Sequence, residues 1–404
     1  MGLKIEDSHN IENESKQLKV RSEKRVLLIL PDLSGGGAER TSLNLLEYLD
    51  PKQFEVDLAL LEGRGEYFNI HRKSRHIITA QGWFSRQALR FSADSIPRGM
   101  IHIFVLRSLI AHHKPDIVMS SMADVSLPVA LAWGLLPKMR KQVRWIAREG
   151  NHTEVVMRET IPSPLIRMLV KKAISWAYRR TDAVIATSEG VAAGLSSSFA
   201  VPREKQIVIG NPVDVAAVTN ACCEEPSVNL PKHFIVAVGR LVYQKGFDIL
   251  LHAFVQINQP GLHLVILGKG PEKLALLELA QSLGVGDKVL FPGFLNNPWS
   301  VIARAQCFCL ASRWEGFGHV IVEAMACGVP VVVSDCPYGP AEIVRNQNEG
   351  VLVPMGNSEA LATALTRLLN DEKRKNTLKK MALKRAQDFS ADQIASYYAN
   401  VFVI

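Results

Sequence analysis

RVLLILPDLSGGGAERTSLNLLEYL, residues 25–49, contains one complete unit of a pattern that recurs along the chain. Its first six residues form a compact apolar run that ends at Pro31, which predicts a short buried strand. The residues after the glycines place leucines at helical spacing: Leu43, Leu45, Leu46 and Leu49. The unit is therefore a strand, a glycine loop and a helix, the order that is typical of domains with a parallel sheet.

Two series of such units follow one another. The first predicts strands at 25–30, 54–61, 116–120, 143–147, 183–187 and 206–209, and the second at 233–238, 263–267, 288–291, 306–310, 330–334 and 350–353. Helical segments fit between them. We predict an α/β protein of two Rossmann-like, doubly wound domains that face one cleft, with ligands at the carboxyl ends of the strands.

The chain divides into five predicted parts. These are a polar, disordered extension at 1–24, a first domain at 25–214, a linker at 215–230, a second domain at 231–389 and a C-terminal helix at 390–404 that could return to the first domain. The extension lacks the apolar run of an export signal. The apolar stretch 125–137 contains prolines and is shorter than the roughly 18 residues of a membrane-spanning helix. The six cysteines lack the density of a disulfide scaffold, so we expect a cytoplasmic protein.

Positive charge is concentrated in the first half. Residues 1–210 hold 30 Lys and Arg against 22 Asp and Glu, which accounts for the whole net charge of +8. Two basic segments, 63–113 and 154–180, would attract anionic surfaces. Because no nucleic-acid-binding fold is recognisable, we expect an anionic membrane surface and no nucleic acid as partner.

Residues 161–180 form a basic amphipathic pattern in which apolar side chains alternate with cations. The candidate membrane-surface residues are Arg167, Lys171, Lys172, Trp176, Arg179 and Arg180. The alternative is a helix that packs on its own sheet and exposes a solvated basic face. The sequence leaves both interpretations open.

The glycine loop 35–37 lies between the first strand and the first helix. Without side chains, Gly36 and Gly37 let the backbone approach a phosphate or sugar at a helix N-terminus, where negative charge is favoured. The spacing differs from the G-x-G-x-x-G of nicotinamide-binding domains. A tight turn without a ligand is the remaining alternative.

Two cations project from one loop of the second domain. Arg240 follows a predicted strand directly, and Lys245 precedes Gly246 at the start of a helix. A planar guanidinium and a compact ammonium together suit a diphosphate whose negative charge grows as it leaves. Solvated loop cations would be the simpler explanation.

Residues 312–326 place two glutamates eight positions apart across a helix start. Gly316 and Gly318 expose backbone amides there to an anion, and Glu323 can accept hydrogen bonds from a ribose diol. Glu315 precedes the helix, near the sugar. The alternatives are an N-terminal cap for Glu315 and a solvent-facing carboxylate for Glu323.

Four segments taken together resemble glycosyltransferase family 4. They are G-G-A-E-R at 36–40, Asn-Pro-Val-Asp at 211–214, G-R-L-x-x-x-K-G at 239–246 and E-G-F-G-x-x-x-x-E-A-M-A-x-G-x-P-V-V at 315–332. The resemblance covers nearly all of the chain after residue 24. It implies the two-domain GT-B fold and a retaining transferase in which the leaving phosphate helps to deprotonate the acceptor.

The resemblance also implies roles for the candidate residues. Arg240 and Lys245 would bind the donor diphosphate, Glu315 the sugar hydroxyls and Glu323 the ribose. The donor site would further include Phe294, beside the base, and Phe317, between the two glycines. No Asp-x-Asp pair occurs to hold a divalent ion, so we expect neither a metal nor another cofactor.

The chain departs from the family pattern after a middle strand of the first domain. Many relatives have a histidine there near the acceptor, whereas residues 147–152 read A-R-E-G-N-H. Arg148, Glu149 and His152 are therefore candidates for acceptor contact, with a surface loop histidine as the alternative for His152.

The expected activity is transfer of a hexose or N-acetylhexosamine from a nucleotide sugar, with UDP favoured. The expected acceptor is lipid-linked or part of a surface glycan, at the inner face of the membrane. Two alternatives keep the same fold: a nucleotide-sugar epimerase, which needs no acceptor, and a silent nucleotide-sugar-binding subunit.

Overall fold

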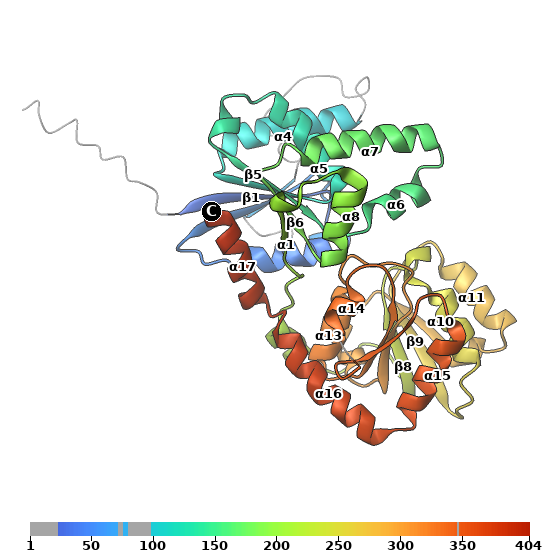
Figure 1. Ribbon diagram of the computed structural model, residues 1–404. Helices are drawn as coiled ribbons and strands as arrows, with labels where there is room; N and C mark the ends of the chain where they lie inside the picture. The colour runs from blue at the N-terminus through green and yellow to red at the C-terminus, as the bar shows by residue number, and fades with distance from the viewer. Residues whose placement is uncertain (1–22, 72–75, 80–97, 346) are drawn as a thin grey trace, which may run out of the picture.

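The chain folds into two α/β domains, each built around a parallel sheet (Figure 1). The computed structural model describes residues 23–71, 76–79, 98–345 and 347–404. Within them the first sheet has the order β3 (Ile77–Thr79), β2 (Phe54–Leu60), β1 (Lys24–Leu30), β4 (Ile117–Ser121), β5 (Arg144–Glu149), β6 (Ala183–Ala186) and β7 (Gln206–Val208). All of these strands pair in parallel, as the alternation of strands and helices predicts.

Helices cover both faces of the first sheet (Figure 1). They are α1 (Gly37–Tyr48), α2 (Glu66–His71), α4 (Arg98–His113), α5 (Ala123–Gly134), α6 (Thr153–Thr160), α7 (Pro164–Tyr178) and α8 (Glu189–Phe199). In β1, Leu27 and Ile29 pack with residues of α4 and α5, while Leu28 and Leu30 pack on the opposite face with α1. Because successive side chains of a strand alternate between faces, a strand that is apolar throughout needs cover on both.

The second sheet has the order β10 (Val289–Gly293), β9 (Leu262–Leu267), β8 (His233–Val238), β11 (Cys307–Leu310), β12 (Val331–Asp335) and β13 (Val351–Pro354). Its helices are α9 (Val215–Ala221), α10 (Phe247–Val255), α11 (Lys273–Ser282), α12 (Trp299–Ile302), α13 (His319–Ala326), α14 (Pro340–Ile343), α15 (Ser358–Leu369) and α16 (Glu372–Gln387). The predicted doubly wound architecture is confirmed in both domains.

The chain crosses between the domains twice, and the two crossings are bonded together. The Val213 amide donates to the Phe389 carbonyl at 2.9 Å, beside a bridge between Val213 and Ser390. After the second crossing, α17 (Ala391–Val403) returns to the first domain and packs beside α1 (Figure 1). The return of the C-terminal helix is thus confirmed.

Three details differ from the predictions. The linker predicted at 215–230 begins with α9, because Val215 and Val218 are buried in the core of the second domain. β3 has only three residues and was not predicted. The predicted extension, up to residue 22, and residues 72–75 and 80–97 of the basic segment 63–113 lie outside the described residues. In the described part of the chain, no helix is long and apolar enough to cross a membrane.

Substitution of two adjacent tyrosines of α17 tests whether this helix packs on the first domain. Tyr398 is fully buried and its hydroxyl accepts a hydrogen bond from Arg148 Nε at 3.0 Å, whereas Tyr397 is 44% exposed. Tyr398→Ala should lower the free energy of unfolding by about 3 to 5 kcal/mol, since it leaves a cavity and removes the hydrogen-bond acceptor of the buried Arg148 Nε. Tyr397→Ala should lower the free energy of unfolding much less. Urea denaturation measures both, and equal losses would contradict the packing of α17.

Candidate functional site

Two loops of the second domain, 240–246 and 312–318, are bonded to each other. Arg313 donates to the Tyr243 carbonyl at 2.8 Å and to both carboxylate oxygens of Asp248 at 2.9 and 2.6 Å. Gln244 Nε2 donates to the Trp314 carbonyl at 2.9 Å. Burial would raise the pKa of Asp248, but the hydrogen bond and charge of Arg313 lower it, so this carboxylate stays ionised. The pairing fixes the second loop against the first.

This pairing brings Lys245 and Glu315 into contact. Lys245 Nζ donates to Glu315 Oε1 at 2.5 Å, and Ser312 Oγ donates to the same oxygen at 2.7 Å. Glu315 is buried and lies three residues before Gly318, the N-cap of α13, so it is not the cap itself. Arg240 is exposed, and its side chain makes no hydrogen bond or ion pair with the described residues, although its charge acts on Glu39 of the first domain. The site therefore holds one paired and one unpaired cation.

Three helix N-termini near these residues lack a side-chain cap. Gly36, Gly246 and Gly318 are the N-caps of α1, α10 and α13. Side-chain caps are present at α7, α8, α9, α15 and α16. They are also absent at α5, α6, α11, α12, α14 and α17, so a missing cap is not confined to this site. An uncapped N-terminus leaves backbone N–H groups free to bind an anion. At α1, however, the carboxylate of Glu39 bonds to its own backbone amide and lies 2.6 Å from the position of an added Cβ at Gly36, so a carboxylate already occupies this N-terminus. At Gly246 a side chain is also excluded, because an added Cβ would lie 2.1 Å from the Ala311 carbonyl oxygen at a φ of +61°.

Glu323 lies in the second turn of α13 and is almost fully buried, at 1% exposure. Its Oε1 forms an ion pair with Arg40 of the first domain, and His319 Nε2 lies 3.6 Å from the same oxygen. Burial, together with the charges of Arg40 and Arg148, holds the pKa of His319 well below its usual value. Oε2 has no hydrogen-bond partner among the described residues. Glu323 is therefore not the solvent-facing carboxylate of the alternative interpretation.

Phe294 and the glycine loop meet at the contact between the domains. An added Cβ at Gly35 would lie 3.7 Å from the Phe294 ring, and that ring contacts Tyr67 of the first domain at 6.4 Å between centroids. An added Cβ at Gly37 would lie 3.8 Å from the Cβ of His319. The N-termini of α1 and α13 thus lie within van der Waals reach of each other.

Two of the three acceptor candidates have intramolecular partners instead of a surface position. Arg148 is fully buried and donates to Tyr398, Thr41 and Asn211. Glu149 is also buried: it accepts a hydrogen bond from Tyr178 Oη at 2.5 Å, and burial raises its pKa. In this conformation neither side chain is open to an acceptor, which corrects both predictions. Only His152 of this group keeps a partly exposed side chain.

Phe317 is a further correction. Its ring is buried, packs edge-on against Phe389 at 5.2 Å between centroids, and would lie 3.0 Å from a side chain at Gly210. An aromatic ring next to the interdomain crossing is stabilised by burial. The side chain of Phe317 therefore supports the crossing and is not part of the donor surface.

Comparisons with known proteins identify the family. Residues 35–217 match the model of Glycosyltransferase Family 4, and residues 224–385 match that of Glycosyl transferases group 1. A Campylobacter jejuni N-acetylgalactosaminyltransferase, whose name gives a diphospho-undecaprenol-linked acceptor, is 33% identical over 91% of this chain and 96% of its own length. The chain belongs to glycosyltransferase family 4. The LpsE glycosyltransferase of lipopolysaccharide core biosynthesis in Rhizobium meliloti is 26% identical over 90% of this chain and 94% of its own.

Solved structures confirm the GT-B fold of this glycosyltransferase. Anabaena HepE in complex with UDP and glucose has a TM-score of 0.73 at 21% identity, covering 94% of this chain and 99% of HepE. Staphylococcus aureus TarM, in a complex that includes UDP, has a TM-score of 0.73 at 14% identity with the same coverage. At such identities the likeness concerns the fold.

The two domains of the glycosyltransferase are joined by a clasp that the sequence did not indicate. Glu342 of α14 accepts hydrogen bonds from the Glu189 and Gly190 amides, the first two of α8, at 2.9 and 3.0 Å. Tyr338, at a φ of +68°, packs on Gly190 and stacks with His152 at 4.3 Å between ring centroids. We call Tyr338 and Glu342 with these partners the clasp.

The clasp is linked to Glu315. The amide of Glu315 donates to the Pro337 carbonyl at 3.2 Å, one residue before Tyr338. The next residue, Gly316, is also held from the first domain: its carbonyl accepts from Thr187 Oγ1 at 3.1 Å, and an added Cβ would lie 1.8 Å from the Gly150 carbonyl oxygen. Contacts from the first domain therefore add to the second-domain bonds that hold the Glu315 loop.

Helix α7 combines features of both interpretations of the basic pattern, the membrane-surface helix and the helix packed on its own sheet. Ile174, Ala177 and Tyr178 pack into the first domain, so one face is part of the core. The opposite face exposes large apolar side chains in the first half of the helix: Leu165 at 62%, Leu169 at 55%, Ile166 and Met168. The cations predicted beside them are distributed around the helix.

The predicted cations of α7 differ in how they are used. Lys172 and Arg179 are exposed, whereas Lys171 lies 3.6 Å from Glu154. Arg167 donates to the Ile161 carbonyl. Trp176 packs against the core, and the guanidinium of Arg180 covers its ring at 3.9 Å. Trp176 is therefore a packing residue.

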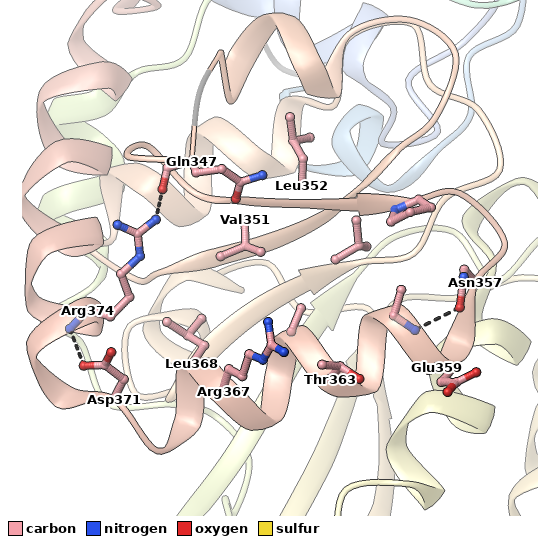
Figure 2. A pocket seen from close by; sticks show the side chains of 14 residues that line it. Gln347, Val351, Leu352, Asn357, Glu359, Thr363, Arg367, Leu368, Asp371 and Arg374 are labelled. Carbon is pink, nitrogen blue, oxygen red and sulfur yellow. Dashed lines mark hydrogen bonds between the residues drawn. The ribbon is translucent and has the colours of Figure 1, made fainter.

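A hollow of about 650 Å³ lies between β13 and α15, away from the candidate donor residues (Figure 2). Two of its polar side chains have local partners: Asn357 caps α15, and Arg374 donates to the Gln347 carbonyl. No candidate site residue lines it. In the described part of the chain, no group of three or more His, Cys, Asp or Glu side chains could hold a metal ion.

Removing the clasp should open the glycosyltransferase. Glu342→Ala leaves the first two amides of α8 without their anionic acceptor, so the domains should separate more often. Small-angle X-ray scattering should then give a larger radius of gyration than wild type. Glu359→Ala, at an exposed first-turn glutamate of α15, is the matched control. An unchanged radius for Glu342→Ala would show that the clasp does not hold the domains together.

Proposed function

We propose that this glycosyltransferase moves a hexose or N-acetylhexosamine from a UDP-sugar to a lipid-linked or surface-glycan acceptor, with retention at the anomeric carbon. One observation carries the proposal: Lys245, just before the uncapped N-terminus of α10, bonds to Glu315, which lies three residues before the uncapped N-terminus of α13, and Arg240 belongs to the same loop as Lys245. Positive charge and free amides there would stabilise a diphosphate as its negative charge grows.

The chemistry follows from that charge distribution. The bond between the anomeric carbon and the diphosphate oxygen breaks, and the acceptor oxygen forms its bond on the same face of the sugar. The acceptor proton passes to the departing phosphate oxygen, so no protein base is required. Glu315, held by Lys245 and Ser312, would accept hydrogen bonds from the sugar hydroxyls.

UDP is proposed as the nucleotide because two structural neighbours were solved with it, HepE with UDP and glucose and TarM with UDP. Glu323 Oε2, buried and without a partner among the described residues, is the proposed acceptor for the ribose hydroxyls. Phe294 is proposed beside the base. Arg240 and Lys245 would neutralise the diphosphate, so we propose that transfer needs no divalent metal.

A lipid-linked acceptor is supported by the name of the Campylobacter jejuni relative, and a surface glycan by that of LpsE. The exposed apolar side chains of α7 beside Lys172 suit an anionic membrane surface, since apolar groups can enter the interface while cations stay at the headgroups. We propose that α7 brings the first domain to the inner face of the membrane.

Nucleotide binding tests the donor site. Lys245→Ala should reduce turnover at least about a hundredfold and abolish the thermal stabilisation by the preferred nucleotide. In wild type, a ligand at 100 times its Kd stabilises by about 2.7 kcal/mol. Thermal unfolding with UDP, GDP and ADP measures this, and Lys273→Ala, at an exposed lysine of α11, is the control. Normal turnover by Lys245→Ala would overturn the proposed site.

Vesicle binding tests the membrane surface. Leu165→Ser with Leu169→Ser should weaken co-sedimentation with phosphatidylglycerol vesicles about tenfold or more. Each substitution removes the hydrophobic free energy that a leucine side chain gains when it moves from water into the membrane interface. Leu274→Ser, at an exposed leucine of α11 in the second domain, should leave binding unchanged. Equal binding by the double variant and wild type would refute the role of α7.

A further inference from the structure

Arg40 of α1 has no role in the function proposed above, yet it contacts the residue on which ribose recognition would depend. Its Nη1 pairs with Glu323 Oε1 across the domain interface, and its side chain is 17% exposed. Nε donates to Tyr67 Oη at 2.5 Å. The guanidinium also lies 5.6 Å from the Tyr67 ring centroid and 6.0 Å from that of Trp299. Contacts from both domains therefore hold Arg40 in place.

The charge of Arg40 compensates that of Glu323. An isolated buried carboxylate is strongly unfavourable, and removing the partner of a buried ion pair is strongly destabilising. His319 cannot supply the charge, because its pKa lies well below the usual value through burial and the nearby charges of Arg40 and Arg148. Among the described residues, Arg40 is the cation that pairs with Glu323.

The ion pair with Arg40 gives the two carboxylate oxygens of Glu323 different surroundings. Oε1 is taken by Arg40 and lies near His319, while Oε2 is buried and has no partner among the described residues. A buried acceptor without a partner costs free energy unless a ligand or water satisfies it. A fixed carboxylate with one free oxygen is suited to accept a hydrogen bond from a sugar hydroxyl.

We propose that Arg40 is a positioning residue for ribose recognition: it crosses from the first domain, holds Glu323 through Oε1 and leaves Oε2 for a ribose hydroxyl. The inference rests on the proposed nucleotide-sugar donor. Since Arg40 and Glu323 belong to different domains, the ribose site is complete only when the domains are together. The first domain then takes part in recognising the donor.

Calorimetric titration with UDP, 2′-deoxy-UDP and 3′-deoxy-UDP tests this. In wild type, loss of the hydroxyl that bonds Glu323 should weaken binding about ten- to a hundredfold, as expected for a hydrogen bond to a charged group. In Arg40→Gln the affinity for UDP should fall towards that of the deoxy analogue, so that the two differ by about threefold or less. Binding of inorganic pyrophosphate should be unchanged, because Arg240 and Lys245 remain.

Further variants separate positioning from folding. Arg40→Lys keeps the charge near Glu323 but loses the planar fork and the bond to Tyr67, so its preference for UDP should lie between those of wild type and Arg40→Gln. Arg64→Gln, at an exposed first-domain arginine paired with Asp32 and Glu62, is the control and should keep the wild-type preference. Thermal unfolding without nucleotide checks that each variant is folded.

The outcomes distinguish the two claims. If wild type binds UDP and both deoxy analogues equally, Glu323 does not bind ribose, and the proposed donor site fails together with this inference. If wild type prefers UDP and both Arg40 variants keep the full preference, the donor site stands and the role of Arg40 is overturned. A reduced preference with unchanged pyrophosphate binding supports it.

Discussion

An almost fully buried carboxylate, that of Glu323, is stable only beside a cation, and its cation comes from the other domain. The ion pair with Arg40 therefore ties the chemistry of the second domain to the position of the first. A glycine makes the approach possible, because an added Cβ at Gly316 would lie 1.8 Å from the Gly150 carbonyl oxygen of the first domain. The clasp acts in the same direction, because Glu342 binds α8 while the neighbouring Pro337 carbonyl holds the amide of Glu315.

Charge is divided between the domains in a way that suits the proposed reaction. The diphosphate would meet Arg240, Lys245 and uncapped helix N-termini, which are fixed by the bonding of the two second-domain loops. The excess basic charge lies in the first half of the chain, where α7 exposes apolar side chains. A closed interface would also exclude water from the transfer, which limits hydrolysis of the donor.

The fold could be predicted because the strands of a parallel sheet are buried on both faces. Each strand therefore has a short, continuous apolar run in the sequence, as β1 does. The sequence also placed Lys245 and Glu315 in loops that follow strands of the second domain, but it did not predict the ion pair between them. Arg148 and Glu149 were misread because polar residues at a strand end resemble ligands, and their partners are distant: Tyr398 is 250 positions from Arg148. The contacts of Arg40 and Glu342 have no local pattern at all, because they form only between folded domains.

The most direct test of the account is the anomeric configuration of the product formed in the presence of a chelator. An α-linked UDP-sugar, labelled with ¹³C at the anomeric carbon, would be incubated with a diphospho-undecaprenol-linked acceptor and EDTA, and the product analysed by NMR. The account predicts an α-linked product formed at the rate seen without EDTA, because cationic side chains and helix N-termini stabilise the leaving diphosphate. A β-linked product, an isomerised donor without transfer, or loss of transfer in EDTA would contradict it.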